Sequence, residues 1–196
     1  MTTGGTATAG PLGSTRYSPA QLRVAVAAME LIADHGVSGT SLQMIADALG
    51  VTKAAVYHQF KTKEAIVIAA TEVELTKLDA ALDAAEAEPG PGSRDALVRQ
   101  VIDLSVARRR MVSAIQHDPV VVRLLSEQRP FQEYMTRLFV VLLGGETDGA
   151  ARLRVAMVAS AIGGAVTHPL VADLDDETLR SRMLDLAREF LGPERR

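Results

Sequence analysis

The stretch that most constrains this chain is residues 40–63, TSLQMIADALGVTKAAVYHQFKTK, which predicts two short helices joined by a tight turn. Thr40 is expected to cap the first helix, in a capping box with Gln43. Gly50 ends that helix, because glycine adopts a left-handed backbone without steric cost. Thr52 then stands where the second helix needs its N-cap. One apolar face along the first helix is formed by Leu42, Ile45, Ala46 and Leu49.

The second helix of this pair, residues 53–60, has two faces of different character. Val56 and Phe60 are four residues apart, so they share one side and can enter a core. The other side carries small residues near the helix start, with a lysine, a tyrosine and a histidine. Small residues allow close approach to a surface, and the three polar groups can bind phosphates or base edges. This is the composition that a recognition helix in a DNA major groove requires.

The string GVTKAAVYHQFKTKEAI resembles the DNA-binding core of TetR-family transcriptional regulators, through the pattern G-V-[ST]-x-x-x-[LV]-Y-x-x-F-x-x-K-E. The resemblance covers roughly residues 18–68. It implies a homodimer that binds a palindromic operator in double-stranded DNA and is released when a small molecule enters a second domain. It also implies that bases are approached by Lys53, Ala54 and Ala55, and that phosphates are held by Thr52, Tyr57, His58 and Lys63. Thr40, at the start of the motif, completes the expected DNA-binding set.

Alanine at positions 54 and 55 departs from the glycine and threonine common in that family. Base recognition in this chain is therefore expected to rely more on van der Waals contact. The net charge of −3 argues against nucleic-acid binding over the whole surface. The three lysines Lys53, Lys61 and Lys63 nevertheless cluster beside the predicted recognition helix, and a local basic patch matters more for phosphate contact than the overall charge.

Helical periodicity continues to the end of the chain, and no strand-like alternation or repeat interrupts it. The predicted fold is all-α, with a disordered tail at 1–15, an N-terminal three-helix helix-turn-helix DNA-binding domain at 16–64 and a C-terminal helical ligand-binding and dimerisation domain at 65–196. A long helix from residue 62 to about residue 86 is expected to connect the two domains. Its end is marked by EPGPG at residues 88–92.

The C-terminal part offers two groups of candidate residues. An apolar effector pocket is predicted from Met111, Ile115, His117, Phe131, Tyr134, Met135 and Met157. Ordinary core packing is the alternative for each of these residues, because methionines and aromatics fill cores as readily as they line pockets. A homodimer interface through the last two long helices is predicted from Ala156, Ser160, Gly164, Leu179, Met183, Leu186 and Phe190.

Several classes of function find no support in the sequence. The chain has no cysteine, and its four histidines are scattered, so neither a metal site nor a cofactor is expected. No nucleophile motif or phosphate-binding glycine loop is present, so no catalytic residue is predicted. Without a signal peptide or an apolar run near the ~20 residues that span a bilayer, the protein is expected in the cytoplasm without a membrane partner.

Two alternatives to a ligand-responsive repressor stay open. The chain could be a helical small-molecule-binding or enzymatic protein with a vestigial helix-turn-helix. It could also be a regulator controlled by a protein partner instead of a small effector.

Overall fold

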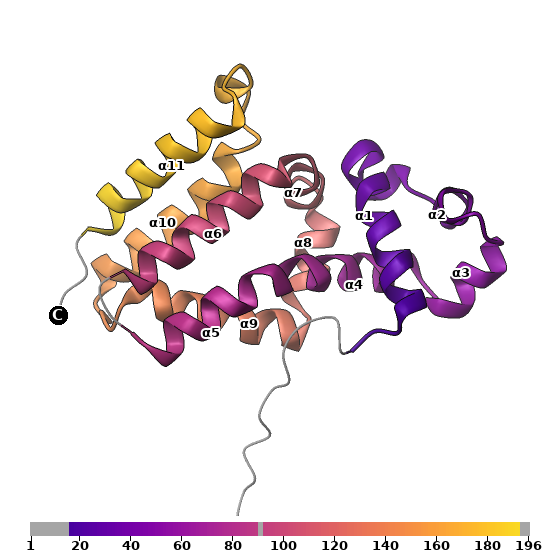
Figure 1. Ribbon diagram of the computed structural model, residues 1–196, viewed down its shortest axis with the longest axis horizontal. Helices are drawn as coiled ribbons and strands as arrows, with labels where there is room; N and C mark the ends of the chain where they lie inside the picture. The colour runs from indigo at the N-terminus through magenta and orange to yellow at the C-terminus, as the bar shows by residue number, and fades with distance from the viewer. Residues whose placement is uncertain (1–15, 90–91, 193–196) are drawn as a thin grey trace, which may run out of the picture.

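The structure is a computed structural model that describes residues 16–89 and 92–192. The predicted disordered tail, residues 1–15, lies outside the described residues. Within them the chain is all-helical (Figure 1). The elements are α1 (Pro19–Gly39), α2 (Leu42–Leu49), α3 (Lys53–Gln59), α4 (Lys63–Leu75), η1 (Thr76–Leu78), α5 (Asp79–Ala87), α6 (Ser93–Ala107), α7 (Arg109–Gln116), α8 (Pro119–Ser126), α9 (Arg129–Leu143), α10 (Gly149–Ala165), η2 (Pro169–Val171) and α11 (Asp176–Leu191).

Several helices begin at residues whose side chains are suited to an N-cap. Ser18 and Gln21 form a reciprocal capping box at the start of α1, with bonds of 3.0 and 3.2 Å. Asp118 caps α8 ahead of Pro119, and Asp175 caps α11. Gly36, with φ of 70°, kinks α1 close to its C-terminal end. Each of these caps depends on residues that are near neighbours in the chain, so residue type at the helix start is enough to specify it.

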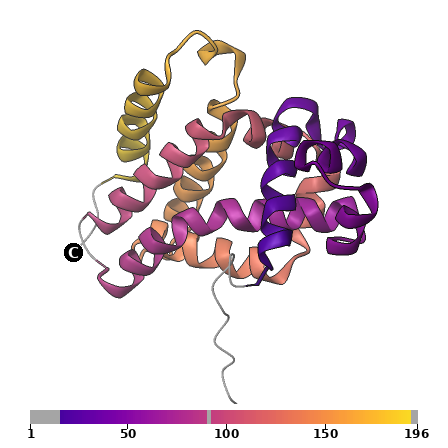
Figure 2. The same ribbon diagram turned by 45° about the vertical axis from the view of Figure 1, so that its right-hand side comes forward.

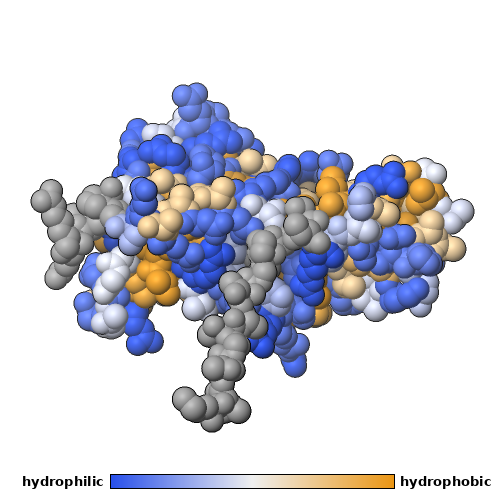
Figure 3. Space-filling model, turned by 60° about the horizontal axis from the view of Figure 1, so that its bottom comes forward, coloured by the Kyte–Doolittle hydropathy of each residue, from blue (hydrophilic) through white to orange (hydrophobic). Residues whose placement is uncertain are grey.

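The helices surround two hydrophobic cores at opposite ends of the molecule. The first core is built mainly by α1–α4, which form one end in Figure 1, with Ile45, Val56 and Ile66 fully buried. The second core lies between η1, α5, α6, α9, α10 and α11, with Leu82 and Leu97 fully buried. Seen from below (Figure 3), the surface is mostly hydrophilic, and apolar residues reach it in separate groups.

The helical path from residue 63 to residue 87 links the two cores, but it is not one continuous α-helix as predicted. A turn of 3-10 helix, η1, separates α4 from α5. At this break the hydroxyl of Thr76 donates a 2.7 Å hydrogen bond to the carbonyl oxygen of Val73. Such local side-chain bonds compete with regular α-helical bonding.

Segments from the second half of the chain pack directly on the N-terminal helices. Met111 of α7, with Val121 and Leu125 of α8, belongs to the same buried cluster as α1–α4. Figure 2 shows α7 and α8 beside α1 and α4. The first core is therefore shared between the helix-turn-helix region and residues far beyond it in sequence. None of the helices in the described part of the chain is long and apolar enough to cross a membrane.

Candidate nucleic-acid interface

The turn between α2 and α3 has the geometry of a helix-turn-helix. Gly50 ends α2 in the left-handed region, with φ of 66°. The hydroxyl of Thr52 accepts a 3.2 Å hydrogen bond from the amide of Ala55 and so caps α3. Both features agree with the prediction, since each rests on a residue type that suits its position.

The start of α2 differs from the prediction by one residue. Ser41, not Thr40, caps the helix, through a 3.2 Å hydrogen bond from the amide of Met44. Thr40 is only 2% exposed, and its hydroxyl donates to the carbonyl oxygen of Gly36. Gln43 pairs with Asp47 instead of closing a capping box. The capping role predicted for Thr40 is therefore wrong, and its buried side chain does not favour the DNA contact expected from the sequence.

The two faces of α3 are arranged as the sequence indicates. Val56 and Phe60 are buried in the first core. The opposite face points away from the rest of the molecule, at the end of the chain's fold that α2 and α3 form in Figure 1. All of its predicted DNA-binding side chains are exposed, namely Thr52, Lys53, Ala54, Ala55, Tyr57 and His58.

Lys61 adds a positive charge to this face. Its ammonium group lies 4.8 Å from the centroid of the Tyr57 ring, which is within the range of a cation–π interaction. The tyrosine ring and the lysine are thus held together beside the end of α3. The sequence shows both residues, but their contact depends on the turn that follows Phe60, so it is found only in the structure.

Lys63 has a different environment from the other two lysines. Its ammonium group donates hydrogen bonds to the carbonyl oxygens of Val37, at 2.8 Å, and Thr40, at 3.3 Å. The side chain is half-buried, so this charge closes the end of α1 rather than facing outward. This geometry favours a positioning role for Lys63 over the predicted phosphate contact.

Comparison with known proteins agrees with this arrangement. Residues 25–70, which run from α1 into α4, match the family described as bacterial regulatory proteins, tetR family. Residues 25–70 therefore form a TetR-family DNA-binding domain. Among curated proteins, none matches the chain.

Solved structures extend the likeness from this domain to the fold of the whole chain. The TetR family transcriptional regulator PfmR from Thermus thermophilus is 21% identical, with a TM-score of 0.62 over 89% of this chain and 100% of that one. The fatty acid degradation regulator FadR from Bacillus halodurans is 21% identical, with a TM-score of 0.66 over 89% of this chain and 96% of that one. The ketosteroid transcriptional regulator KstR2 of Mycobacterium tuberculosis is 16% identical, with a TM-score of 0.65 over 95% of this chain and 100% of that one.

The predicted effector residues of this chain do not gather in one place. Met111 belongs to the first core, with Ile115 and Phe131 packed against it, whereas Tyr134 belongs to the second core, with Met135 beside it. His117 is exposed, and its Nδ1 lies 2.9 Å from the carbonyl oxygen of Ser113. Met157 is 50% exposed on α10 and lines neither core, so it does not belong with a buried pocket.

The predicted dimer residues of this chain divide into two sets. Leu179 and Met183 are buried in the second core of the same chain, so their side chains cannot contact a partner. Leu186 and Phe190, further along α11, are about half exposed. The three small residues predicted on α10 are not enclosed by the core, namely Ala156, Ser160 and Gly164.

Proposed function

We propose that this chain is a TetR-family repressor that binds a palindromic operator as a homodimer and leaves it when a small, mostly apolar effector binds. The observation that carries the DNA-binding part is the exposed face of α3. Lys53, Ala54 and Ala55 lie in its first turn, where a recognition helix meets base edges. Tyr57 and His58 follow on the same exposed face, where they can hold the flanking phosphates.

The homodimer is proposed through α10 and α11. Exposed apolar side chains gather on these helices, and monomeric proteins rarely leave such groups uncovered in one patch. They are Leu153, Met157, Leu186 and Phe190, which are 50–61% exposed. Two copies of the pair would form a four-helix interface with two-fold symmetry. That symmetry would place the two recognition helices on successive half-sites of a palindrome, ~34–36 Å apart on straight DNA.

The effector site is proposed in the second core, where two buried polar atoms have no hydrogen-bond partner. These are the hydroxyl oxygen of Tyr134 and Oδ1 of Asp79. Burial raises the pKa of Tyr134, and the nearby Asp79 carboxylate raises it further. Native proteins leave few buried polar groups without a hydrogen-bond partner. A ligand whose polar end lies beside Tyr134 and Asp79 would supply the partners that these two groups lack.

The surroundings of this pair favour an apolar ligand body. Leu138, Val155 and Ile162 belong to the same buried cluster, and Met135 packs against it. A ligand here would contact α5 and α9, and α5 continues through η1 into α4. A shift of α5 can therefore reach the DNA-binding helices along one connected path. A coupling of ~1–3 kcal/mol along it would change operator affinity ~5–150-fold.

Selection of bound DNA from random sequence tests the DNA-binding part. We expect an enriched palindrome, bound less tightly as salt rises. Tyr57→Ala should weaken binding on all sequences about equally, whereas Lys53→Ala should change the preferred bases. Arg123→Ala, on the exposed face of α8, is the control and should leave both properties unchanged. Failure to enrich any sequence would contradict the proposal.

The effector part has its own test. Apolar compounds that bind the protein are titrated with and without the selected operator. Linkage requires that ligand weakens operator binding by the same factor as operator weakens ligand binding. Tyr134→Phe should weaken binding of effectors that carry a hydrogen-bonding group, without a direct effect on DNA affinity. A compound that binds tightly near Tyr134 and leaves operator affinity unchanged would contradict release by an effector, although not DNA binding.

A further inference from the structure

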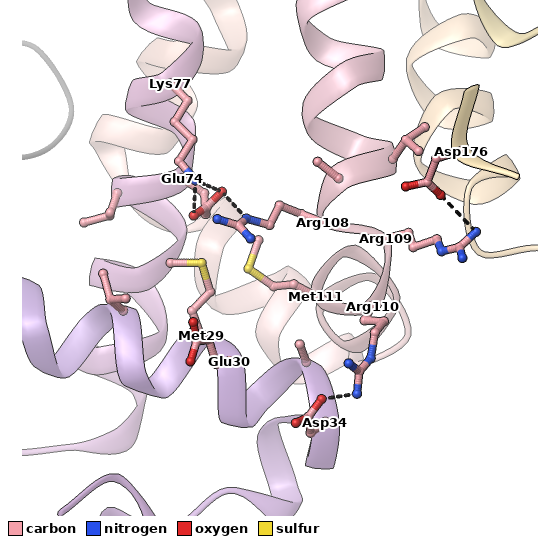
Figure 4. Close-up of a pocket in the computed structure, with 15 residues that line it drawn as sticks. Met29, Glu30, Asp34, Glu74, Lys77, Arg108, Arg109, Arg110, Met111 and Asp176 are labelled. Atoms are coloured by element: carbon pink, nitrogen blue, oxygen red, sulfur yellow. Dashed lines mark hydrogen bonds and ion pairs between the residues drawn. The ribbon is translucent and has the colours of Figure 1, made fainter. Parts of the chain in front are cut away.

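A separate groove lies where the N-terminal helices meet the second half of the chain. It encloses about 530 Å³ and is bounded by α1, the α4–η1 segment, the α6–α7 junction and the first turn of α11 (Figure 4). This volume is within the ~300–1,000 Å³ of small-molecule sites. The groove does not include Tyr134 or Asp79, so it is distinct from the proposed effector site in the second core.

One wall of the groove is apolar. On this wall, Met29 of α1 and Met111 of α7 lie close together (Figure 4). Three valines extend the apolar surface, namely Val26, Val73 and Val106. Both methionines are largely buried, at 6% and 8% exposed. Their flexible, polarisable side chains adapt to ligands of varied shape. This wall can therefore hold the apolar body of a ligand.

The other wall carries three consecutive arginines. Arg108 donates through Nε to the buried carboxylate of Glu74, at 3.1 Å, and Lys77 donates to the same carboxylate at 2.6 and 2.7 Å. Arg110 pairs with Asp34 of α1. Arg109 lies 3.6 Å from a carboxylate oxygen of Asp176, too far for a hydrogen bond.

The arginine wall has more donors than its acidic partners use. Each guanidinium carries five N–H groups. Among the described residues, Arg108 donates a hydrogen bond only through Nε, and Arg109 donates none. The buried carboxylate of Glu74 is already matched by two cations. Glu30, the remaining acid of the lining, lies beside Met29 and across the groove from Arg109 (Figure 4).

We propose that this groove binds an amphiphilic organic anion. Its carboxylate, sulfonate or phosphate group would accept hydrogen bonds from the free N–H groups of Arg108 and Arg109. Its apolar body would lie on Met29 and Met111. Charge-assisted hydrogen bonds to arginine are strong and directional, which suits an anionic head group. A cationic head group at this wall would be repelled by the like charges of Arg108 and Arg109.

The position of the groove also predicts an effect on the fold. A ligand bound there contacts α1 and α4 on one side and α7 on the other. It would add contacts across a boundary that the Arg110–Asp34 ion pair already joins. Because binding to the folded state stabilises it by mass action, the midpoint of thermal unfolding should rise with ligand concentration.

Two fluorescent probes that differ by one group test the proposal. 8-Anilinonaphthalene-1-sulfonate carries the anionic head, and N-phenyl-1-naphthylamine has the same ring system without it. We expect the sulfonate to bind the full chain at least about 10-fold more tightly, since a tenfold ratio corresponds to ~1.4 kcal/mol, which is slightly less than a hydrogen bond to a charged group contributes. Equal affinity for the two probes, or no binding of the sulfonate up to ~1 mM, overturns the proposal.

Two variants with the same change in net charge locate the site. Arg109→Gln should weaken sulfonate binding about 10-fold and leave the neutral probe unaffected, because it removes donors and keeps the half-exposed stem. Arg129→Gln, on α9 and away from the groove, should leave both affinities unchanged. Thermal unfolding of each variant checks that it folds. Sulfonate binding that is unchanged in Arg109→Gln, or equally weakened in both variants, overturns the assignment to this groove.

Discussion

The ammonium group of Lys63, in the first turn of α4, donates a 2.8 Å hydrogen bond to the carbonyl oxygen of Val37 near the end of α1. The same group reaches the carbonyl oxygen of Thr40, at the α1–α2 turn, at 3.3 Å. Carbonyl groups at the end of a helix lack the partners that they would have in its interior. Lys63 therefore joins the first turn of α4 to the end of α1 and to the turn that leads into α2.

Lys63→Met should lower the free energy of unfolding by about 1–3 kcal/mol, because two half-buried carbonyl groups lose a charged donor. Its effect on DNA binding should be uniform across sequences, with the salt dependence unchanged. Lys61→Met, which removes an exposed charge beside α3, should instead reduce the slope of log affinity against log salt by about 0.9. Urea titration and binding at several salt concentrations measure both. A reduced slope for Lys63→Met would restore the phosphate contact expected from the sequence.

The hydroxyl groups of Tyr17 and Tyr134 predict opposite effects of the same substitution. Tyr17 donates a 2.6 Å hydrogen bond to the buried carboxylate of Glu72, which Arg16 also holds at 3.0 Å. Tyr17→Phe should therefore cost about 1–3 kcal/mol of stability. The Tyr134 hydroxyl is buried without a partner, so Tyr134→Phe should be neutral or stabilising by about 1 kcal/mol. Urea unfolding of both variants tests this, and two losses of similar size would contradict it.

The same two tyrosines predict a loss of stability in alkaline solution. Burial raises the pKa of both above the ordinary value of 10.0, and for Tyr17 the hydrogen bond to Glu72 raises it further. A raised folded-state pKa means that the folded protein retains a proton that the unfolded chain loses. The contribution is thus complete below pH 10 and declines as pH rises above it, by up to about 1.4 kcal/mol per pH unit for each tyrosine. Unfolding from pH 8 to pH 11 should show a shallower decline in the double variant Tyr17→Phe, Tyr134→Phe than in the native chain, and parallel curves would contradict this.

Features of this fold that depend on neighbouring residues can be predicted from the sequence. Helix caps form hydrogen bonds only to groups a few residues away in the chain. The roles of Thr52, Gly50 and the pair Ser18 and Gln21 can therefore be predicted from residue type. The N-cap of α2 could not be predicted in this way, because two adjacent residues there are chemically equivalent. Thr40 and Ser41 can both cap a helix, and only the packing of Thr40 against Gly36 decides between them.

Features formed by distant segments could not be predicted from one sequence. The arginine run at residues 108–110 was visible, but its partners Asp34 and Glu74 lie far away in the chain. Likewise, the unpaired state of the Tyr134 hydroxyl depends on what surrounds it in the second core. The family resemblance specified the DNA-binding helices because they carry the sequence pattern, and the second domain carries none.

The apolar stripe of α11 predicts where a second copy binds. Leu179, Met183, Leu186 and Phe190 share one side of the helix, yet the first two are buried and the last two are about half exposed. The chain's own helices therefore cover the N-terminal half of this stripe and leave the C-terminal half uncovered. Leu186→Asp should separate the proposed dimer into folded monomers, whereas Leu179→Ala should instead lower the free energy of unfolding by about 2–5 kcal/mol.

Two neighbouring glycines on α10 give a matched test of the same interface. A Cβ at Gly164 would meet nothing within 4 Å in the protomer, so the backbone at Gly164 has room for a side chain that points toward a partner. A Cβ at Gly163 would come within 1.8 Å of Nε2 of Gln116, so Gly163→Ala must move that side chain inside the protomer. We expect Gly164→Leu to weaken association by ~1–3 kcal/mol or more in sedimentation equilibrium, without lowering the free energy of unfolding of the monomer. Gly163→Ala should leave the association constant near that of the native chain. If Gly164→Leu and Leu186→Asp both sediment as unchanged dimers, the two copies meet through a different surface.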